Sequence, residues 1–264
     1  MSVASEFLES GFAVLPNVLR ETELAELNAA IDEDMRASPA EWVYFSDSFI
    51  QTVDILPRRS DFDGVVEHPA VLPVLRELIG PDLTFEEFSI ILRNPTTEGS
   101  DHKSWHRDII RSFDRRFEID AISANFYLTD VTETDHCFSI IPGTHGPRAD
   151  LRPEDIQPGM EVDLVAPAGS VVLFHARCLH SGKLKPHSRQ RRTLHLYYSR
   201  MTGPRTSEWS SIPERLYGSG NPLYGKWNRA DVIDGTGRKP RDLDPMIGAA
   251  AMLREVQRRA NAKR

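Results

Sequence analysis

The chain has 264 residues, 40% of them hydrophobic and 27% charged, which is the composition of a globular protein with a sizeable core. The net charge of −7 argues against a nucleic-acid partner, because such a partner is held by basic side chains on its phosphates. The chain has no apolar run of about 18 residues that could span a membrane, so no membrane partner is expected. It has no signal-peptide start and only two cysteines, without a CxxC pair, so a cytoplasmic protein is expected.

The first third of the chain alternates between helix and strand patterns. An apolar strand is expected over residues 11–15, and a helix with apolar residues at helical spacing follows over 22–31. Residues 41–66 show no clear period and predict a loop rich in aromatic side chains. A further helix is expected over 68–80, with Gly80 as its C-terminal cap.

After this helix, short apolar segments separated by turn residues predict a series of strands. These strands are expected at 85–92, 119–128, 137–141, 161–165, 170–174 and 192–199. There is no alternation of strands with helices and no internal repeat, so a mainly β protein with flanking helices is predicted, built as a sandwich or barrel. We expect one domain over 1–264 with its core at about 80–200, a substrate lid at 203–245 and a C-terminal helix at 246–262.

The segment Trp105-His106-Arg107-Asp108 carries the first chemical signal. On an extended strand, residues two apart share one face, so His106 and Asp108 supply two of the three ligands of a two-histidine, one-carboxylate iron site. A third ligand has to come from a distant strand, and both His175 and His180 qualify. Further on, an arginine among residues 189–192 can clamp a carboxylate with two hydrogen bonds.

Several further motifs stand at matching places along the chain. A strand ends in Leu128-Thr129-Asp130-Val131-Thr132 and leads to Cys137, an Ile-Pro-Gly-Thr-His turn occupies 141–145, and a Gly-to-His stretch covers 169–180 before an Arg-Arg pair. With W-H-x-D, this series resembles the phytanoyl-CoA dioxygenase-like (PhyH) branch of the Fe(II)/2-oxoglutarate oxygenases. The resemblance covers roughly residues 8–200, including the opening Gly-Phe-Ala-Val-Leu-Pro at 11–16.

The resemblance implies a double-stranded β-helix, or jelly roll, with helices packed on one sheet. It implies that His106, Asp108 and His180 bind Fe(II), and that Arg191 holds the far carboxylate of 2-oxoglutarate. His175 then falls on a non-ligand position, where packing at a strand end is the expected role. Arg192 is the alternative anchor, because adjacent strand residues point to opposite faces.

Two further side chains are candidate contacts of the cosubstrate. If Arg191 points inward, then so do Thr193, His195 and Tyr197, and Thr193 can add a hydroxyl to the same carboxylate. Arg93 falls near a polar position that contacts the cosubstrate in the family, with an ordinary surface arginine as the alternative.

Two positions depart from the family pattern. Asn125 replaces a frequent aromatic residue, and its amide can bond the cosubstrate or the substrate, or it is a buried structural asparagine. His136 replaces the usual glycine before Cys137 and is expected to be solvated.

The implied activity is that of a 2-oxoglutarate-dependent dioxygenase, which consumes 2-oxoglutarate and O2 and releases succinate and CO2. Because halogenating relatives lack the carboxylate that Asp108 provides, we expect hydroxylation, desaturation or cyclisation of a small metabolite or natural-product intermediate. Two alternatives stay open: a non-catalytic jelly-roll protein that binds metal and ligand, and a cupin-like isomerase or zinc hydrolase, which has no use for Arg191.

Aromatic side chains in the expected lid and in the 41–60 loop are candidates for the pocket wall, although core packing is the preferred role for each. They are Trp42, Tyr44, Trp209, Tyr217 and Trp227. Arg58 and Arg59 can hold an anionic substrate, but a solvated loop is the favoured interpretation.

Overall fold

The computed structural model describes residues 2–99, 105–108, 121–183, 185–202, 205 and 209–236. The predicted C-terminal helix at 246–262 lies outside this range, as does the end of the predicted lid. No helix among the described residues is long and apolar enough to cross a membrane.

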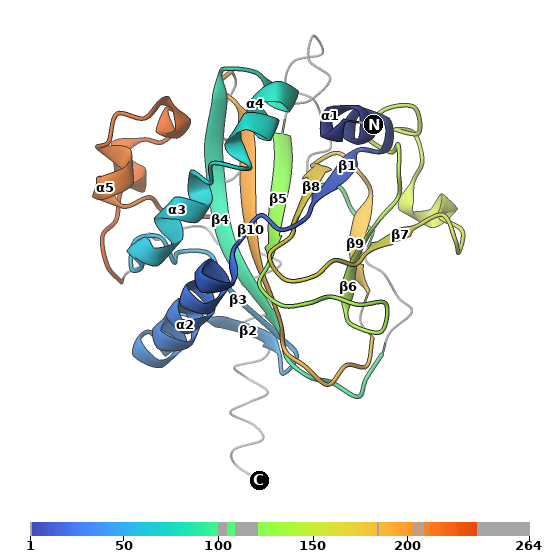
Figure 1. The fold of residues 1–264 in the computed structure, drawn as a ribbon, viewed down its shortest axis with the longest axis horizontal. Coiled ribbons are helices and arrows are strands. Elements are labelled where there is room, and N and C mark those ends of the chain that lie inside the picture. Colours follow the sequence, from blue (N-terminus) through green and yellow to red (C-terminus); the bar gives the residue numbers. More distant parts are fainter. Residues whose placement is uncertain are drawn as a thin grey trace.

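Two antiparallel sheets form the body of the protein (Figure 1). The large sheet has seven strands in the order β1 (Phe12–Leu15), β8 (Val171–His175), β5 (Ala121–Tyr127), β10 (Arg191–Arg200), β4 (Leu83–Arg93), β3 (Phe49–Thr52) and β2 (Val43–Ser46). The small sheet has the order β7 (Val162–Leu164), β6 (Cys137–Ile140) and β9 (His180–Lys183). This is the predicted jelly roll.

Helices cover the face of the large sheet that is turned away from the small one. In Figure 1, α2, α3 and α4 lie on this side, and α1 lies beside β1. The α-helices are α1 (Val3–Ser10), α2 (Glu21–Ala37), α3 (Asp63–Val66), α4 (Leu72–Ile79) and α5 (Glu214–Tyr217). The 3-10 helices are η1 (Pro39–Glu41), η2 (Ser60–Phe62), η3 (Pro153–Asp155), η4 (Pro222–Tyr224) and η5 (Arg229–Asp231).

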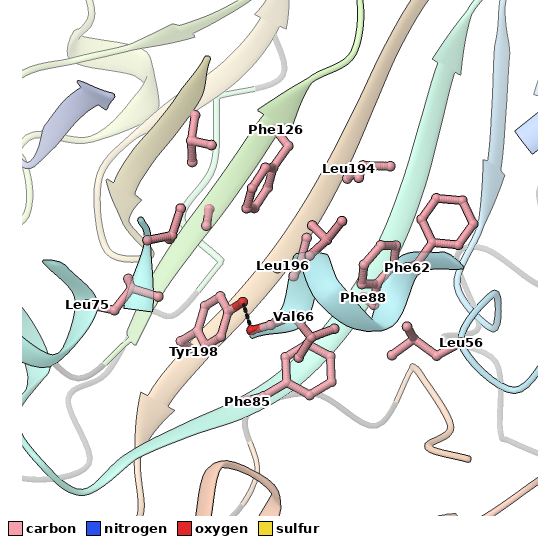
Figure 2. Close-up of a cluster of buried hydrophobic side chains, with 14 of the residues drawn as sticks. Leu56, Phe62, Val66, Leu75, Phe85, Phe88, Phe126, Leu194, Leu196 and Tyr198 are labelled. Carbon is pink, nitrogen blue, oxygen red and sulfur yellow. Dashed lines mark hydrogen bonds between the residues drawn. The ribbon is translucent and has the colours of Figure 1, made fainter. Parts of the chain in front are cut away.

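Strand β10 divides its side chains between two environments. Leu194, Leu196 and Tyr198 join the core beneath the helices, where the Tyr198 hydroxyl donates to the carbonyl of Val66 at 2.9 Å (Figure 2). The intervening residues therefore face the small sheet, because successive strand residues alternate in direction. Between the sheets lies a second apolar cluster, formed by Tyr127, Val131, Cys137, Phe138, Ile140, Leu164, Ala166, Val172, Phe174 and Cys178.

Local predictions were wrong in two places. The 41–66 segment contains the hairpin of β2 and β3, and β3 pairs with β4, so sheet pairing decided what the aperiodic pattern did not show. Helix α4 begins at Leu72 and not near residue 68.

Candidate metal and cosubstrate site

The H-x-D segment lies beside β9 as an added edge of the small sheet. His106 and His180 form an antiparallel bridge, with backbone N–H···O distances of 3.1 and 3.0 Å. The Asp108 amide donates to the carbonyl of Ala176 at 3.0 Å. Backbone pairing thus brings His180 next to His106 and Asp108, which lie far from it in the sequence.

The three side chains have the geometry of a metal site. Their ligand atoms all lie within 4.8 Å of one another. Asp108 Oδ1 is 3.6 Å from His106 Nε2 and 3.3 Å from His180 Nε2. The His180 side chain is 6% exposed but that of His106 is 54% exposed, so the site is open on the His106 side. Two imidazoles and one carboxylate with an open side are the donor set of non-haem Fe(II) oxygenases.

Neighbouring groups orient two of these ligands. His180 Nδ1 lies 3.0 Å from the carbonyl of Cys178, which holds a proton on Nδ1 and leaves Nε2 as the nitrogen that faces Asp108 and that a metal would bind. The Tyr197 hydroxyl donates to Asp108 Oδ2 at 2.7 Å and leaves Oδ1 on the side of the histidines. The ring of Phe174 packs against His180 with its centroid 4.8 Å away.

The electrostatics favour an ionised aspartate. Burial alone would raise the pKa of Asp108, but the charge of His180 and the hydrogen bonds from His180 and Tyr197 outweigh it and hold this pKa below its usual range. The carboxylate is therefore in the form that binds a cation.

The two adjacent arginines at the start of β10 lie in different environments. Arg191 is 6% exposed, points between the sheets and donates from Nη1 to the carbonyl of His136 at 3.5 Å. Arg192 lies on the helical side, where it forms an ion pair with Asp32 of α2 at 2.7 Å. Arg191 forms no ion pair with any residue that the structure describes, and its Nε has no hydrogen-bond partner.

Three more buried nitrogens without a partner lie in the same region. They are Arg93 Nε, Asn125 Nδ2 and His136 Nδ1. Arg93 is the register partner of Arg191 on β4, and burial together with the charge of Arg191 lowers its pKa to about 10. Buried polar groups are normally satisfied, so a group of unsatisfied donors around a buried cation fits an anionic ligand such as a dicarboxylate.

Thr193 and His195 lie between this region and the metal ligands. Thr193 Oγ1 is 2.9 Å from His195 Nε2, so its hydroxyl is already engaged with the imidazole. Burial lowers the pKa of His195 to about 3, and the charge of Arg191 adds to the effect. The alternation of β10 placed His195 and Tyr197 on this face, but nothing in the sequence pattern indicated the Tyr197–Asp108 contact.

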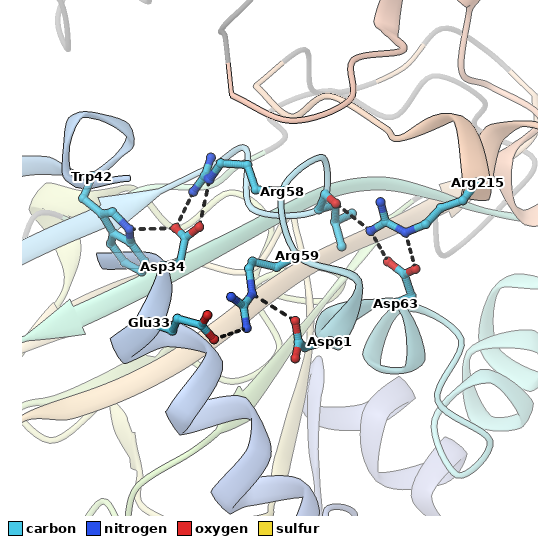
Figure 3. Close-up of polar contacts among 9 residues, drawn as sticks. Glu33, Asp34, Trp42, Arg58, Arg59, Asp61, Asp63 and Arg215 are labelled. Carbon is cyan, nitrogen blue, oxygen red and sulfur yellow. Dashed lines mark hydrogen bonds and ion pairs between the residues drawn. The ribbon is translucent and has the colours of Figure 1, made fainter. Parts of the chain in front are cut away.

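The structure corrects two expectations about basic side chains. His136 is 3% exposed and not solvated, because it lies inside the barrel next to Gly182 and Arg191. Arg58 and Arg59 are not solvated either: Arg58 pairs with buried Asp34, and Arg59 pairs with Glu33 and Asp61 (Figure 3). Neither arginine is free for an anionic substrate.

Two of the five aromatic wall candidates belong to the buried core. Trp42 and Trp227 are each 4% exposed, and their indole N–H groups donate to Asp34 and to the Phe85 carbonyl. Tyr44 is 53% exposed. Core packing, the preferred role, is therefore what Trp42 and Trp227 do. His175 also packs as expected, against the rings of Phe7 and His145.

The sequence profile of the phytanoyl-CoA dioxygenase (PhyH) family matches residues 7–193. The chain belongs to this family. Members of the phytanoyl-CoA dioxygenase family are oxygenases that use iron and 2-oxoglutarate, and the triad and the buried arginine found here fit that cofactor set.

One relative is L-proline trans-4-hydroxylase from Streptomyces griseoviridis, which is 24% identical over 76% of this chain and 90% of its own length. Among solved structures, the non-heme monooxygenase ThoJ in its apo form is 22% identical, covers 98% of this chain and 96% of its own, and superposes with a TM-score of 0.64. The epimerase SnoN, in complex with Fe3+, alpha-ketoglutarate and nogalamycin RO, is 21% identical over 76% of this chain and 83% of its own, with a TM-score of 0.62. At identities this low, the similarity to the two structures shows that the fold is shared.

Proposed function

We propose that this protein hydroxylates, desaturates or cyclises a small metabolite or natural-product intermediate, using O2 and converting 2-oxoglutarate to succinate and CO2. His106, Asp108 and His180 hold Fe(II), and Arg191 holds the far carboxylate of 2-oxoglutarate. The observation that carries the proposal is the combination of the triad with a buried guanidinium that has no carboxylate partner among the described residues.

When bound, Fe(II) supplies the centre at which 2-oxoglutarate and O2 react. The protein's side chains prepare that centre. Tyr197 orients the Asp108 carboxylate, and the Cys178 carbonyl fixes the tautomer of His180. Arg191 supplies a fixed positive charge, and Arg93 and Asn125 add unpartnered donors nearby. Burial of this region excludes water from the anion, which strengthens each of these contacts.

The choice of a small-molecule substrate is supported by the relatives. One relative is an L-proline trans-4-hydroxylase, and the neighbours SnoN and SnoK are an epimerase and a carbocyclase of nogalamycin biosynthesis. Such different reactions on one fold agree with a site whose iron end is constant while the substrate side varies. Thr193 as a direct carboxylate contact stays a prediction, because its hydroxyl bonds His195.

The deciding experiment is a succinate-release screen over a metabolite library, with purified protein, Fe(II), ascorbate and 2-oxoglutarate. Succinate that forms only with particular compounds, and that disappears in Asp108→Ala, supports the proposal. Fe(II) and 2-oxoglutarate binding without oxygen consumption under any condition supports the non-catalytic alternative. Turnover that Arg191→Ala leaves unchanged favours the isomerase or hydrolase alternative.

A further inference from the structure

His136 occupies the interior of the barrel, at the position just before β6. A β-carbon built on Gly182 would lie 3.3 Å from His136 Nε2, so the ring fills the space that this glycine leaves on β9. Gly182 is two residues from His180, and the two therefore share the face of β9 that is turned to the metal site. The backbone carbonyl of His136 accepts the Nη1 hydrogen bond of Arg191 at 3.5 Å.

The imidazole of His136 has a buried nitrogen that lacks a hydrogen-bond partner. This atom is Nδ1, and His136 as a whole is only 3% exposed. A buried group of this kind costs free energy unless a ligand satisfies it. The unpartnered Nε atoms of Arg191 and Arg93 add two cationic donors, and this surrounding favours an acceptor that carries negative charge.

We propose that His136 is a cosubstrate-binding residue whose neutral imidazole donates from Nδ1 to the far carboxylate of 2-oxoglutarate, beside Arg191. This inference rests on the proposed function and adds to it a residue that replaces the glycine usual in the family. The residue makes recognition of a dicarboxylate depend on three side chains, His136, Arg191 and Arg93.

The surroundings keep the ring uncharged. Burial lowers the pKa of His136 to about 2, and the charges of Arg191, Arg93, His187 and Lys185 act in the same direction. A neutral histidine has one N–H donor, and Nδ1 is the ring nitrogen that is fully buried without a hydrogen-bond partner. The proposal assigns the proton to Nδ1, where a ligand carboxylate can accept it.

The test compares two substitutions at this position. His136→Phe keeps the ring but removes the donor, and His136→Asn places an amide nitrogen close to the position of Nδ1. Affinity is measured anaerobically by calorimetry on the Fe(II)-loaded protein. The two probes are 2-oxoglutarate and 2-oxovalerate, a five-carbon keto acid that lacks the far carboxylate.

The expected result is that His136→Phe weakens 2-oxoglutarate binding by about 10- to 100-fold, the value of a hydrogen bond to a charged group. The affinities for 2-oxovalerate and Fe(II) stay the same, and His136→Asn restores most of the 2-oxoglutarate affinity. Equal 2-oxoglutarate affinity in His136→Phe and the wild type overturns the inference but leaves the proposed function intact. Absence of 2-oxoglutarate binding to the wild type overturns both. If the Phe variant does not fold, His136→Gly is measured against the same criteria.

Discussion

At the scale of single residues, one step along β10 separates two functions. Arg191 points between the sheets and has no carboxylate partner among the residues described, whereas Arg192 points to α2 and pairs with Asp32. A guanidinium held in place without an internal counter-ion is suited to an anionic ligand. The adjacent position therefore offers a matched control for the cosubstrate anchor.

Arg191→Ala is expected to raise KM for 2-oxoglutarate by about 10- to 100-fold, because it removes charged hydrogen bonds to the far carboxylate. Arg192→Ala should leave KM unchanged and lower stability by about 1–2 kcal/mol, since it removes a partly exposed ion pair with Asp32 and hydrogen bonds to Asn28 and Gln190. Both are measured by succinate formation over a range of 2-oxoglutarate concentrations. An equal effect of the two substitutions would contradict the assignment of Arg191.

A second residue prediction concerns Tyr197, which donates to Asp108 at 2.7 Å. Tyr197→Phe should weaken Fe(II) binding by about 10- to 100-fold, because groups that orient a metal ligand have effects of this size. Tyr198→Phe is the control: it loses the bond to the Val66 carbonyl on the opposite face and should keep the Fe(II) affinity of the wild type. Anaerobic Fe(II) titration measures both, and unchanged affinity in Tyr197→Phe would rule out an orienting role.

At the scale of elements, a buried ion pair joins α2 to the segment that leads into η2. Arg58 and Asp34 have side chains 4% and 2% exposed and are joined by two hydrogen bonds of 2.7 and 3.0 Å (Figure 3). The indole of Trp42 donates to the same carboxylate at 3.0 Å. This aspartate therefore fixes the positions of three segments against the large sheet.

Arg58→Ala is expected to lower the free energy of unfolding by about 3–5 kcal/mol, because it leaves the Asp34 carboxylate buried without its cation. Arg59→Ala breaks pairs whose acidic partners, Glu33 and Asp61, are 60% and 40% exposed, so it should cost about 1 kcal/mol or less. Urea unfolding measures both values. Similar midpoints for the two variants would show that burial of the pair has no energetic effect.

At the scale of the whole molecule, buried neutral histidines link stability to pH. Folding lowers the pKa of His136 to about 2 and that of His195 to about 3, from an ordinary value of 6.5. Burial also lowers the pKa of His68. The unfolded chain therefore binds more protons than the folded one below pH 6.5, and stability is lost as pH falls.

For the protein free of metal and cosubstrate, the free energy of unfolding should decrease below about pH 6.5, by about 1.4 kcal/mol per pH unit for each such histidine. Replacing both His136 and His195 with asparagine should make this dependence shallower between pH 6 and pH 4, because about two fewer protons are taken up on unfolding. Urea unfolding at stepped pH values checks the slope. An unchanged slope in the double variant would contradict the burial of the two rings as neutral groups.

The motifs predicted much of the fold and site because their information is local. The spacing of His106 and Asp108, the strand periods and the series of family motifs were sufficient to indicate the jelly roll and its family. Pairing between strands was not local: the β2–β3 hairpin forms because β3 finds an edge on β4, and no period in residues 41–66 shows it.

At the cosubstrate site, too, some features follow from the local sequence and others depend on tertiary packing. Alternation along β10 predicted that Arg191 and Arg192 face opposite sides, but the side that each one faces depends on the sheet, the helix and Asp32. Burial of His136 depends on Gly182 from another strand, which a single position in the sequence does not reveal. Residue types and spacing thus established the chemistry that is available. Packing of distant segments established which polar atoms are left without partners, because burial and hydrogen-bond satisfaction are properties of the assembled fold.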